Sequence, residues 1–279
     1  TNAITVRNLM THHSGLQGDF RKGMMGSEYI PNNFRTTVSL YRDLYAAFPP
    51  EQVHAYNNMS VALLGIIIER VSGLDFAEYM KKKILIPLDM DTASFVPLYA
   101  RKDLDAVAAL PYENMKEGHK LFIRNLPAGS LNSSTMDMTH FIQMMLGKGR
   151  YNEQVILSES SMAEMYSVQN NHIAFDGGFP QGLNYMLFRD GMEYAGNFAG
   201  HNGGTAFFFS SMGVLRDHGL GVVIATNSLE GEDVVDDILN VVLRKALELK
   251  TGLTPKRESP PNLTPQQIQA YEGLYCITR

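Results

Sequence analysis

This sequence contains little cysteine, no tryptophan and only a small net charge. Its 279 residues include one cysteine, Cys276, and no tryptophan. A single cysteine excludes an internal disulfide and a thiolate metal cluster. The net charge of −5 disfavours binding to nucleic acid or to an anionic membrane surface. No apolar run approaches the roughly 18 residues of a membrane span, since the longest, around 61–68, has the length of a core helix.

Familiar catalytic signatures are also lacking. We find no Walker loop, no dinucleotide-binding glycine fingerprint, no HExxH and no GxSxG elbow. The pair His12-His13 invites a metal interpretation, but adjacent residues on a helix point in different directions and no third ligand is suitably spaced. We therefore expect these histidines to pack or cap, and the sequence implies neither a metal nor an organic cofactor.

The composition that remains is that of a folded chain. Hydrophobic residues make up 44% and charged residues 19%, which excludes a disordered protein. The first two-thirds predict helices joined by loops. Thr5 caps a short helix that carries Leu9 and Met10, with Gly15 as a stop, and Thr37 opens a helix that ends before Pro49.

Further helices follow along this region. Residues 60–72 are apolar around nearly the whole circumference, which predicts a central helix, and Gly73 ends it. Asp75 and Glu78 form a capping-box pattern at the start of the next helix. Two more helices are predicted over 135–146 and 159–166, capped by Ser134 and Ser158.

After about residue 182 the hydrophobic period changes to that of strands. Strands are predicted over 184–189, 206–215 and 220–227, with a hairpin turn at 216–219, and a long amphipathic helix follows over 232–250. Helices followed by an antiparallel sheet indicate an α+β fold. We expect 1–182 and 183–252 to form one catalytic domain, and 253–279 to be a proline-rich linker and the beginning of a possible extra domain.

Two local patterns carry candidate chemistry. Tyr56-Asn57-Asn58 directly precedes the predicted central helix, where a phenol can shuttle a proton and an amide can bind an acyl substrate. Gly200-His201-Asn202-Gly203-Gly204 opens a predicted strand, where glycines let a substrate approach and a backbone N–H can face an oxyanion. Each pattern alone is more typical of capping or of a bend.

The order of the motifs resembles the active-site-serine superfamily of class C β-lactamases, penicillin-binding proteins, D-aminopeptidases and related esterases. The match runs in order over about residues 4–250. It comprises Ile4–Leu16 (family ITxRxLLTHTSGL), Tyr56-Asn57-Asn58 with 63–73 (YSN…LLGxIIExVSG), Pro87–Met90 (PLGM), Leu126–Leu131 (PAGGL) and His201-Asn202-Gly203 (KTG or HxG).

The resemblance implies a β-lactamase/transpeptidase-like fold and a role for each matched residue. Tyr56 relays protons, Asn58 holds the acyl side of the substrate, and the backbone N–H of Gly204 supplies half of an oxyanion hole. His201 lines the opposite wall beside Asn202 and Gly203, which contact substrate. Histidine is mostly neutral at pH 7, so hydrolysis of a small ester, amide or peptide is favoured over efficient β-lactam hydrolysis.

One family element is not found in the sequence. The family nucleophile is a serine in an S-x-x-K motif, with the lysine three residues on, some tens of residues before the THTSG segment. No serine in these 279 residues has lysine three positions later. We therefore expect this chain to lack the N-terminal part, with the nucleophile and further sheet strands, and to be inactive alone.

Two other interpretations stay open. The chain can be an inactive family scaffold that binds a ligand or partner protein, which explains the absent motif directly. Alternatively, another serine acts as nucleophile, with Ser14, Ser133 and Ser134 nearest to family motifs. The cellular compartment and the oligomeric state leave no signal in the sequence.

Overall fold

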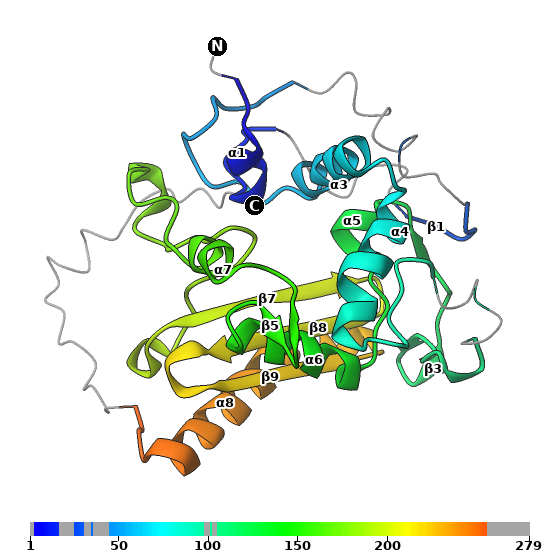
Figure 1. Cartoon of the computed structure of the whole chain (residues 1–279). Helices are drawn as coiled ribbons and strands as arrows, with labels where there is room; N and C mark the ends of the chain where they lie inside the picture. The colour runs from blue at the N-terminus through cyan, green and yellow to red at the C-terminus, as the bar shows by residue number, and fades with distance from the viewer. Residues whose placement is uncertain are drawn as a thin grey trace, which may run out of the picture.

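An antiparallel three-stranded sheet forms the middle of the molecule (Figure 1). It consists of β7 (Phe198–Thr205), β8 (Phe208–Leu215) and β9 (Leu220–Thr226), side by side in that order. The computed structural model describes residues 3–16, 25–30, 35, 45–97, 101 and 105–255. Both connections in the sheet are short, so each strand pairs with its neighbour in sequence, which confirms the predicted α+β layout.

Helices cover both faces of this sheet. On one face, α8 (Val235–Thr251) presents Leu239, Leu243 and Leu247, which are spaced by four residues and are fully buried. The other face is covered by α6 (Thr135–Leu146), whose Ile142 packs in one cluster with Val214 of β8. Burying each of these leucines contributes about 1.5–3 kcal/mol, so α8 and the sheet are held together mainly by hydrophobic burial.

A mainly helical region lies above the sheet in Figure 1. Its α-helices are α1 (Val6–Met10), α3 (Asn58–Ser72), α4 (Phe76–Met80), α5 (Leu126–Gly129) and α7 (Glu159–Met165). A π-helical turn over Lys81–Leu85 and a 3₁₀ turn over Ile86–Leu88 continue α4. Short strands pair as β1 (Met25–Gly26) with β4 (Phe122–Ile123), β2 (Tyr112–Glu113) with β3 (Lys116–Glu117), and β5 (Arg150–Tyr151) with β6 (Gln154–Val155).

Several helix boundaries confirm the sequence predictions because they depend on local hydrogen bonds. The Thr5 side chain caps α1, and Ser134 and Ser158 cap α6 and α7. Gly73 ends α3 in the left-handed conformation, with φ of 71°. The first helix, however, ends at Met10, so Gly15 is not its stop.

The sequence predicts α3 as a central helix, but within the described residues only one side of it is buried. Met59 and Ala62 are buried, but Ile66 to Ile68 are only partly buried and Val71 is 84% exposed. Within the described residues, neighbouring elements pack against only one side of the helix. The apolar pattern alone does not show which side is covered.

The capping box predicted at the next helix does not form either. Asp75 occupies the N-cap position of α4 but makes no side-chain cap hydrogen bond. Instead, the Phe76 N–H donates to Glu69 Oε1 at 2.9 Å. A carboxylate from α3 thus accepts a hydrogen bond from the first backbone N–H of α4.

Two strand predictions need correction. Residues 184–189 form no strand and make only isolated bridges through Met186. The glycine-rich segment lies inside β7, a separate strand, and does not open the strand predicted over 206–215. Ala206 and Phe207 instead turn the chain between β7 and β8, and the hairpin turn at 216–219 is confirmed.

Other predictions fall mostly outside the described residues. Most of the helix expected to begin at Thr37 lies there, and its end, residues 45–48, is not helical. The linker and tail beyond Pro255 also lie there, and the proposed division into regions stays a prediction. No helix in the described part of the chain is both long and apolar enough to cross a membrane.

We expect Gly15→Ala to destabilise the fold strongly. Gly15 has φ of 70°, and a Cβ there would meet the Phe48 carbonyl oxygen at 2.0 Å. Gly73 has φ of 71° but open space around it, so Gly73→Ala isolates the cost of the backbone conformation, about 1–2 kcal/mol. Gly15→Ala should lower the unfolding free energy by about 3 kcal/mol or more in chemical denaturation. Equal losses of unfolding free energy in the two variants would refute the close approach of Gly15 to the Phe48 carbonyl.

Candidate functional site

The start of α3 is fixed by Asn57, which the structure shows as its N-cap. The Asn57 side chain accepts a hydrogen bond from the Ser60 N–H at 2.8 Å and donates to the Leu16 carbonyl. Asn57 is 1% exposed, so both bonds lie in the interior. This cap holds the Tyr56-Asn57-Asn58 segment against the turn that follows α1.

The turn after α1 is attached to α3 at two further points. The hydroxyls of Ser14 and Ser60 lie 2.8 Å apart and both are buried. The Asn57 N–H donates to His12 Nδ1 at 3.2 Å. Because Nδ1 accepts this bond, a neutral His12 carries its proton on Nε2.

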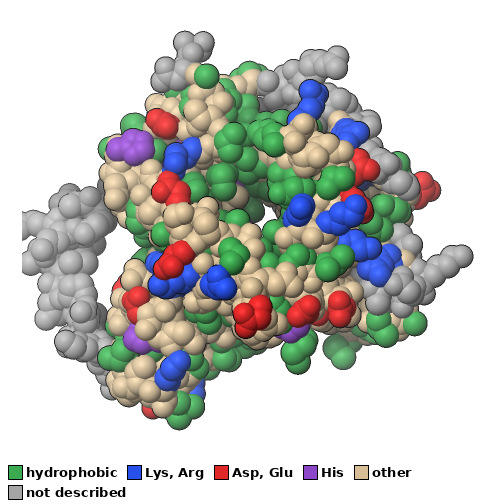
Figure 2. Space-filling view, viewed as in Figure 1, with side chains coloured by type: hydrophobic (Ala, Val, Ile, Leu, Met, Phe, Trp, Pro, Cys, Tyr) green, Lys and Arg blue, Asp and Glu red, His purple; other side chains and the backbone are tan. Residues whose placement is uncertain are grey.

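A hollow of about 340 Å³ lies between this turn and the edge of the sheet. Tyr56 stands in its wall between two histidines, with its ring centroid 4.5 Å from that of His12 and 6.0 Å from that of His201. Figure 2 shows one face of the molecule, where hydrophobic side chains gather above a hollowed middle. The residues that line the hollow are His12, His54, Tyr56, Phe179, Gln181, Met186, His201 and Asn202.

The histidines of the hollow are held neutral. Burial, together with the neighbouring His54, His201 and His13, lowers the pKa of His12 to about 3. Burial likewise lowers the pKa of His54 and of His201. The hollow therefore offers no fixed positive charge from these rings at neutral pH.

His201 keeps one ring nitrogen for an incoming group. Its Nδ1–H donates to the Asn202 carbonyl, since a carbonyl oxygen only accepts. A neutral imidazole with its proton on Nδ1 leaves a lone pair on Nε2. This nitrogen can accept a proton or a hydrogen bond beside Tyr56.

The outer edge of β7 is open beside the hollow. The N–H and C=O of Gly200 both bond to Met186, each at 3.0 Å, and so point away from β8. Because the direction alternates along a strand, the N–H groups of Asn202 and Gly204 point to the same outer edge. The Asn202 side chain donates to Asp236 Oδ2 at 3.4 Å, which orients this edge relative to α8.

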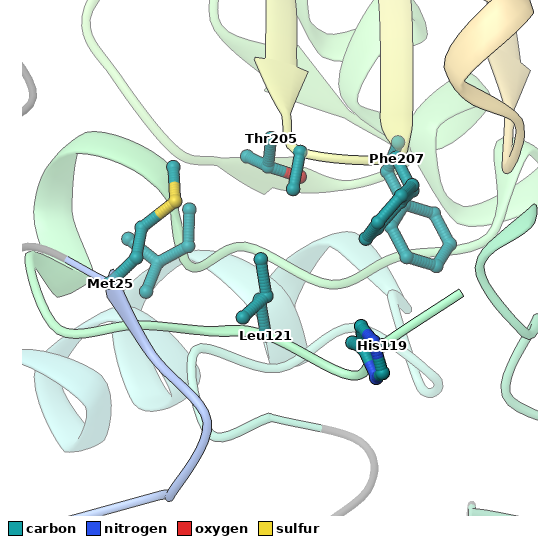
Figure 3. Close-up of a pocket in the computed structure, with 8 residues that line it drawn as sticks. Met25, His119, Leu121, Thr205 and Phe207 are labelled. Atoms are coloured by element: carbon teal, nitrogen blue, oxygen red, sulfur yellow. The ribbon is translucent and has the colours of Figure 1, made fainter. Parts of the chain in front are cut away.

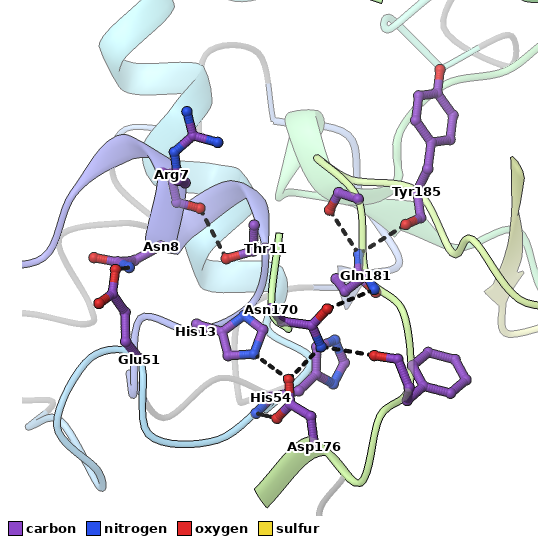
Figure 4. Close-up of polar contacts among 12 residues, drawn as sticks. Arg7, Asn8, Thr11, His13, Glu51, His54, Asn170, Asp176, Gln181 and Tyr185 are labelled. Carbon is purple, nitrogen blue, oxygen red and sulfur yellow. Dashed lines mark hydrogen bonds and ion pairs between the residues drawn. The ribbon is translucent and has the colours of Figure 1, made fainter. Parts of the chain in front are cut away.

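A buried carboxylate holds the floor of the site together (Figure 4). Asp176 accepts hydrogen bonds from His13 Nε2 and the His54 N–H, each at 2.8 Å, and from Asn170 Nδ2. Burial alone raises the pKa of Asp176, but the donors Asn170, His54 and His13 outweigh it and lower the pKa. Asn170 also accepts the Gln181 N–H at 3.0 Å, so the network reaches the lining of the hollow.

The structure brings together only part of the predicted site. Tyr56, His201 and Asn202 line the hollow. Asn58 is buried as the first residue of α3, and Gly203 and Gly204 lie exposed farther along β7. None of these three lines the hollow, and their roles stay predictions.

Sequence reasoning missed His54, Gln181 and Asp176. His54 lies two residues before Tyr56, and this closeness was a usable signal. Gln181 and Asp176 are more than a hundred residues away from Tyr56 in the sequence, and no motif marked them. Among the described residues, no group of three or more histidine, cysteine or acidic side chains is arranged to hold a metal.

A second, smaller hollow lies beyond the tip of the β7–β8 hairpin (Figure 3). Met25, Leu121 and Phe207 form much of its apolar lining, with His119 and Thr205 at its border. Its volume of about 20 Å³ is close to that of one water molecule. It is therefore too small to be the main substrate site.

Burial of neutral His12 makes stability depend on pH. The unfolded chain binds a proton at His12 below about pH 6.5, whereas the folded chain does so only near pH 3. The contribution of His12 to the free energy of unfolding is therefore complete above pH 6.5. It falls by about 1.4 kcal/mol per pH unit as the pH drops toward 3.

In denaturant titrations between about pH 4 and 6, His12→Asn should reduce the dependence of the unfolding free energy on pH. The reduction should correspond to about one proton fewer taken up on unfolding. Asparagine tolerates the positive φ of His12 and keeps an acceptor for the Asn57 N–H. Asn171→Ala, at an exposed residue whose side chain does not titrate, is the control and should leave the slope unchanged. An unaltered slope in His12→Asn would contradict the buried neutral state.

Known proteins share this sequence and this architecture. The sequence model of the Beta-lactamase family matches residues 1–245. Penicillin-binding protein 4* of Bacillus subtilis is 24% identical over 254 residues, which cover 85% of this chain and 54% of that protein. The chain thus spans about half the length of this relative.

Solved structures agree in fold. The octameric penicillin-binding protein homologue from Pyrococcus abyssi superposes with a TM-score of 0.68 at 27% identity, covering 91% of this chain and 57% of that one. A beta-lactamase/D-alanine carboxypeptidase from Yersinia pestis superposes with a TM-score of 0.65 at 18% identity, covering 86% and 69%. The fold is β-lactamase/transpeptidase-like, and the chain belongs to the Beta-lactamase family, whose members are serine hydrolases.

Proposed function

We propose that this chain carries most of the catalytic site of a serine hydrolase that cleaves an ester or amide through an acyl-enzyme. The observation that carries the proposal is the position of Tyr56 in the wall of the hollow, with the rings of His12 and His201 at 4.5 and 6.0 Å. A phenol held there can pass a proton between a nucleophile and a leaving group.

The open edge of β7 supports the placement of the substrate. The outward N–H of Gly204 is a donor for an oxyanion, which forms when a nucleophile adds to the carbonyl. Asn202 and Gly203 extend this edge as contacts for the substrate. Asn58 is proposed for the acyl side because it follows Tyr56 at the start of α3, although it does not line the described hollow.

The lining of the hollow favours an uncharged acyl group. It contains aromatic, histidine, amide and methionine side chains, and no lysine or arginine among the described residues. His201 is neutral, since burial lowers its pKa. A substrate carboxylate therefore lacks a permanent cation here, and we propose an esterase or peptidase rather than an efficient β-lactamase.

The nucleophile is proposed to come from an S-x-x-K segment that this sequence does not contain. None of the candidate serines lines the hollow. Ser14 is 1% exposed and bonded to Ser60, and Ser134 caps α6. Ser133 donates to the Ser134 carbonyl at 3.1 Å. These contacts argue against a substitute serine.

The present chain should not react with a fluorophosphonate probe that acylates active-site serines. Mass spectrometry of the treated chain should show the unmodified mass, because no serine lies beside Tyr56 in the hollow. Stoichiometric labelling would refute the assignment of the nucleophile. The reading frame upstream of Thr1 should encode S-x-x-K, and a frame without it would favour the binding scaffold.

In a form that carries the S-x-x-K segment, Tyr56→Phe should lower kcat for a p-nitrophenyl ester by about 10²–10⁴-fold, because the proton relay is lost. Tyr45→Phe, at a tyrosine that is 69% exposed and outside the hollow, is the matched control and should keep the rate. An unchanged rate in Tyr56→Phe would remove this role. Measurable ester binding without turnover in the unaltered form would instead favour a ligand-binding scaffold.

A further inference from the structure

One side of α8 carries a row of polar side chains that the proposed hydrolase chemistry does not use. Asp236, Asn240 and Arg244 are spaced by four residues, so they lie on the same side of the helix. All three bond to residues of the segment 189–191, which leads into β7. This side of α8 therefore holds the chain just before the strand whose edge is proposed to receive the oxyanion.

Arg189 makes most of these contacts. Its Nη1 donates to Asp236 Oδ1 at 2.9 Å and its Nη2 to the Asp236 carbonyl at 2.7 Å. Its Nε donates to Asn240 Oδ1 at 2.7 Å. The Arg189 side chain is 13% exposed. Three hydrogen bonds fix the planar guanidinium in one orientation, which a lysine ammonium does not reproduce.

The second carboxylate oxygen of Asp236 faces β7. Asn202 Nδ2 donates to Asp236 Oδ2 at 3.4 Å, and Ser211 of β8, the register partner of Asn202, also contacts Asp236. Burial alone raises the pKa of Asp236, but its contacts with these two residues and with Arg189 outweigh burial and lower the pKa. Asp236 is therefore ionised at neutral pH, directly behind a residue that lines the hollow.

An unpaired negative charge at this place would oppose the chemistry proposed for β7. The outward N–H of Gly204 lies two residues beyond Asn202, about 7 Å along the strand. An oxyanion bound there lies within the range over which an unscreened carboxylate repels it. The guanidinium of Arg189 supplies the opposite charge and cancels that of Asp236.

We propose that Arg189 and Asp236 are positioning residues for the edge of β7, an inference that rests on the proposed hydrolase function. Asp236 orients Asn202, and Arg189 neutralises Asp236. The outward N–H groups of the edge thus meet an oxyanion with no net negative charge behind them. Neither side chain lines the hollow, so both act through Asn202 and through their charges.

Steady-state kinetics in a form that carries the S-x-x-K segment test this charge balance. Arg189→Gln leaves Asp236 unpaired and should lower kcat for a p-nitrophenyl ester about tenfold at neutral pH, with KM unchanged. Asp236→Asn removes the negative charge and keeps an acceptor for Asn202, so it should keep the parent kcat. The double variant should also keep it. An equal loss of kcat in Arg189→Gln and Asp236→Asn would overturn the proposal.

The pH profile separates this electrostatic role from a purely structural one. Of the groups that contact Asp236 in the described chain, namely Arg189, Asn202 and Ser211, only Arg189 is charged, and Asp237 beside it on α8 is exposed. Without Arg189 the pKa of Asp236 rises, because burial is no longer opposed by the cation. The kcat of Arg189→Gln, relative to that of the double variant, should therefore rise toward one on acidification. A ratio independent of pH would overturn the proposal.

Arg244→Gln is the matched control. Arg244 donates from the same side of α8 to the Gly191 carbonyl at 3.0 Å. Its loss therefore loosens the same segment but leaves no carboxylate unpaired. The pH dependence of kcat should remain that of the parent. A profile like that of Arg189→Gln would show that loosening alone is sufficient, and would overturn the role of charge.

Nuclear magnetic resonance of the present chain requires no turnover. In Arg189→Gln, the side-chain amide signal of Asn202 should shift with pH as Asp236 titrates, and in the double variant it should not. A signal that does not shift in Arg189→Gln would overturn the positioning of Asn202 by Asp236. A shift found together with no ester turnover in the S-x-x-K form would instead reject the hydrolase proposal, so the two failures are distinct.

Discussion

The buried carboxylate of Asp176 is the interaction on which the site depends. It joins three segments that are distant in sequence, through His13, His54 and Asn170. The Asp176 and His13 side chains are 1% and 2% exposed, so water cannot replace a missing partner. Removing one member of such a buried pair typically costs about 3–5 kcal/mol. The hollow keeps its shape because donors from three residues converge on this one carboxylate.

The same desolvation that strengthens this network determines the chemistry of the hollow. The rings that line the hollow are removed from water, and this burial lowers the pKa of His12 and of His201. A cluster of histidines thereby becomes an uncharged wall with defined donors and acceptors. Tyr56 lies against this wall and remains 37% exposed. This wall carries no fixed cation for an anion, and that is the physical basis on which an ester or a peptide, rather than a carboxylate-bearing substrate, is proposed.

The sequence correctly predicted those features that depend on interactions between residues close together in the chain. Caps such as Thr5, Ser134 and Ser158 were correct because each bonds to a backbone N–H three residues away. Errors arose where the outcome depends on distant partners. The strand expected over 184–189 became isolated bridges because only Met186 meets β7. Tyr56 and His201 were found through family motifs, whereas Asp176 had none, because its role depends on contacts across more than a hundred residues.

Helix α3 and strand β9 both have apolar sequences typical of buried elements, but the described residues cover only one side of each. The two differ in which groups they leave exposed. The uncovered side of α3, with Val71 at 84% exposure, leaves apolar side chains in water, but its backbone is satisfied within the helix. The outer edge of β9 leaves directional N–H and C=O groups as well. Hydrophobic contact accepts many partners, whereas a row of backbone donors and acceptors accepts only another strand in register. The edge of β9 is therefore the more selective of these two surfaces, because it accepts only a strand in register.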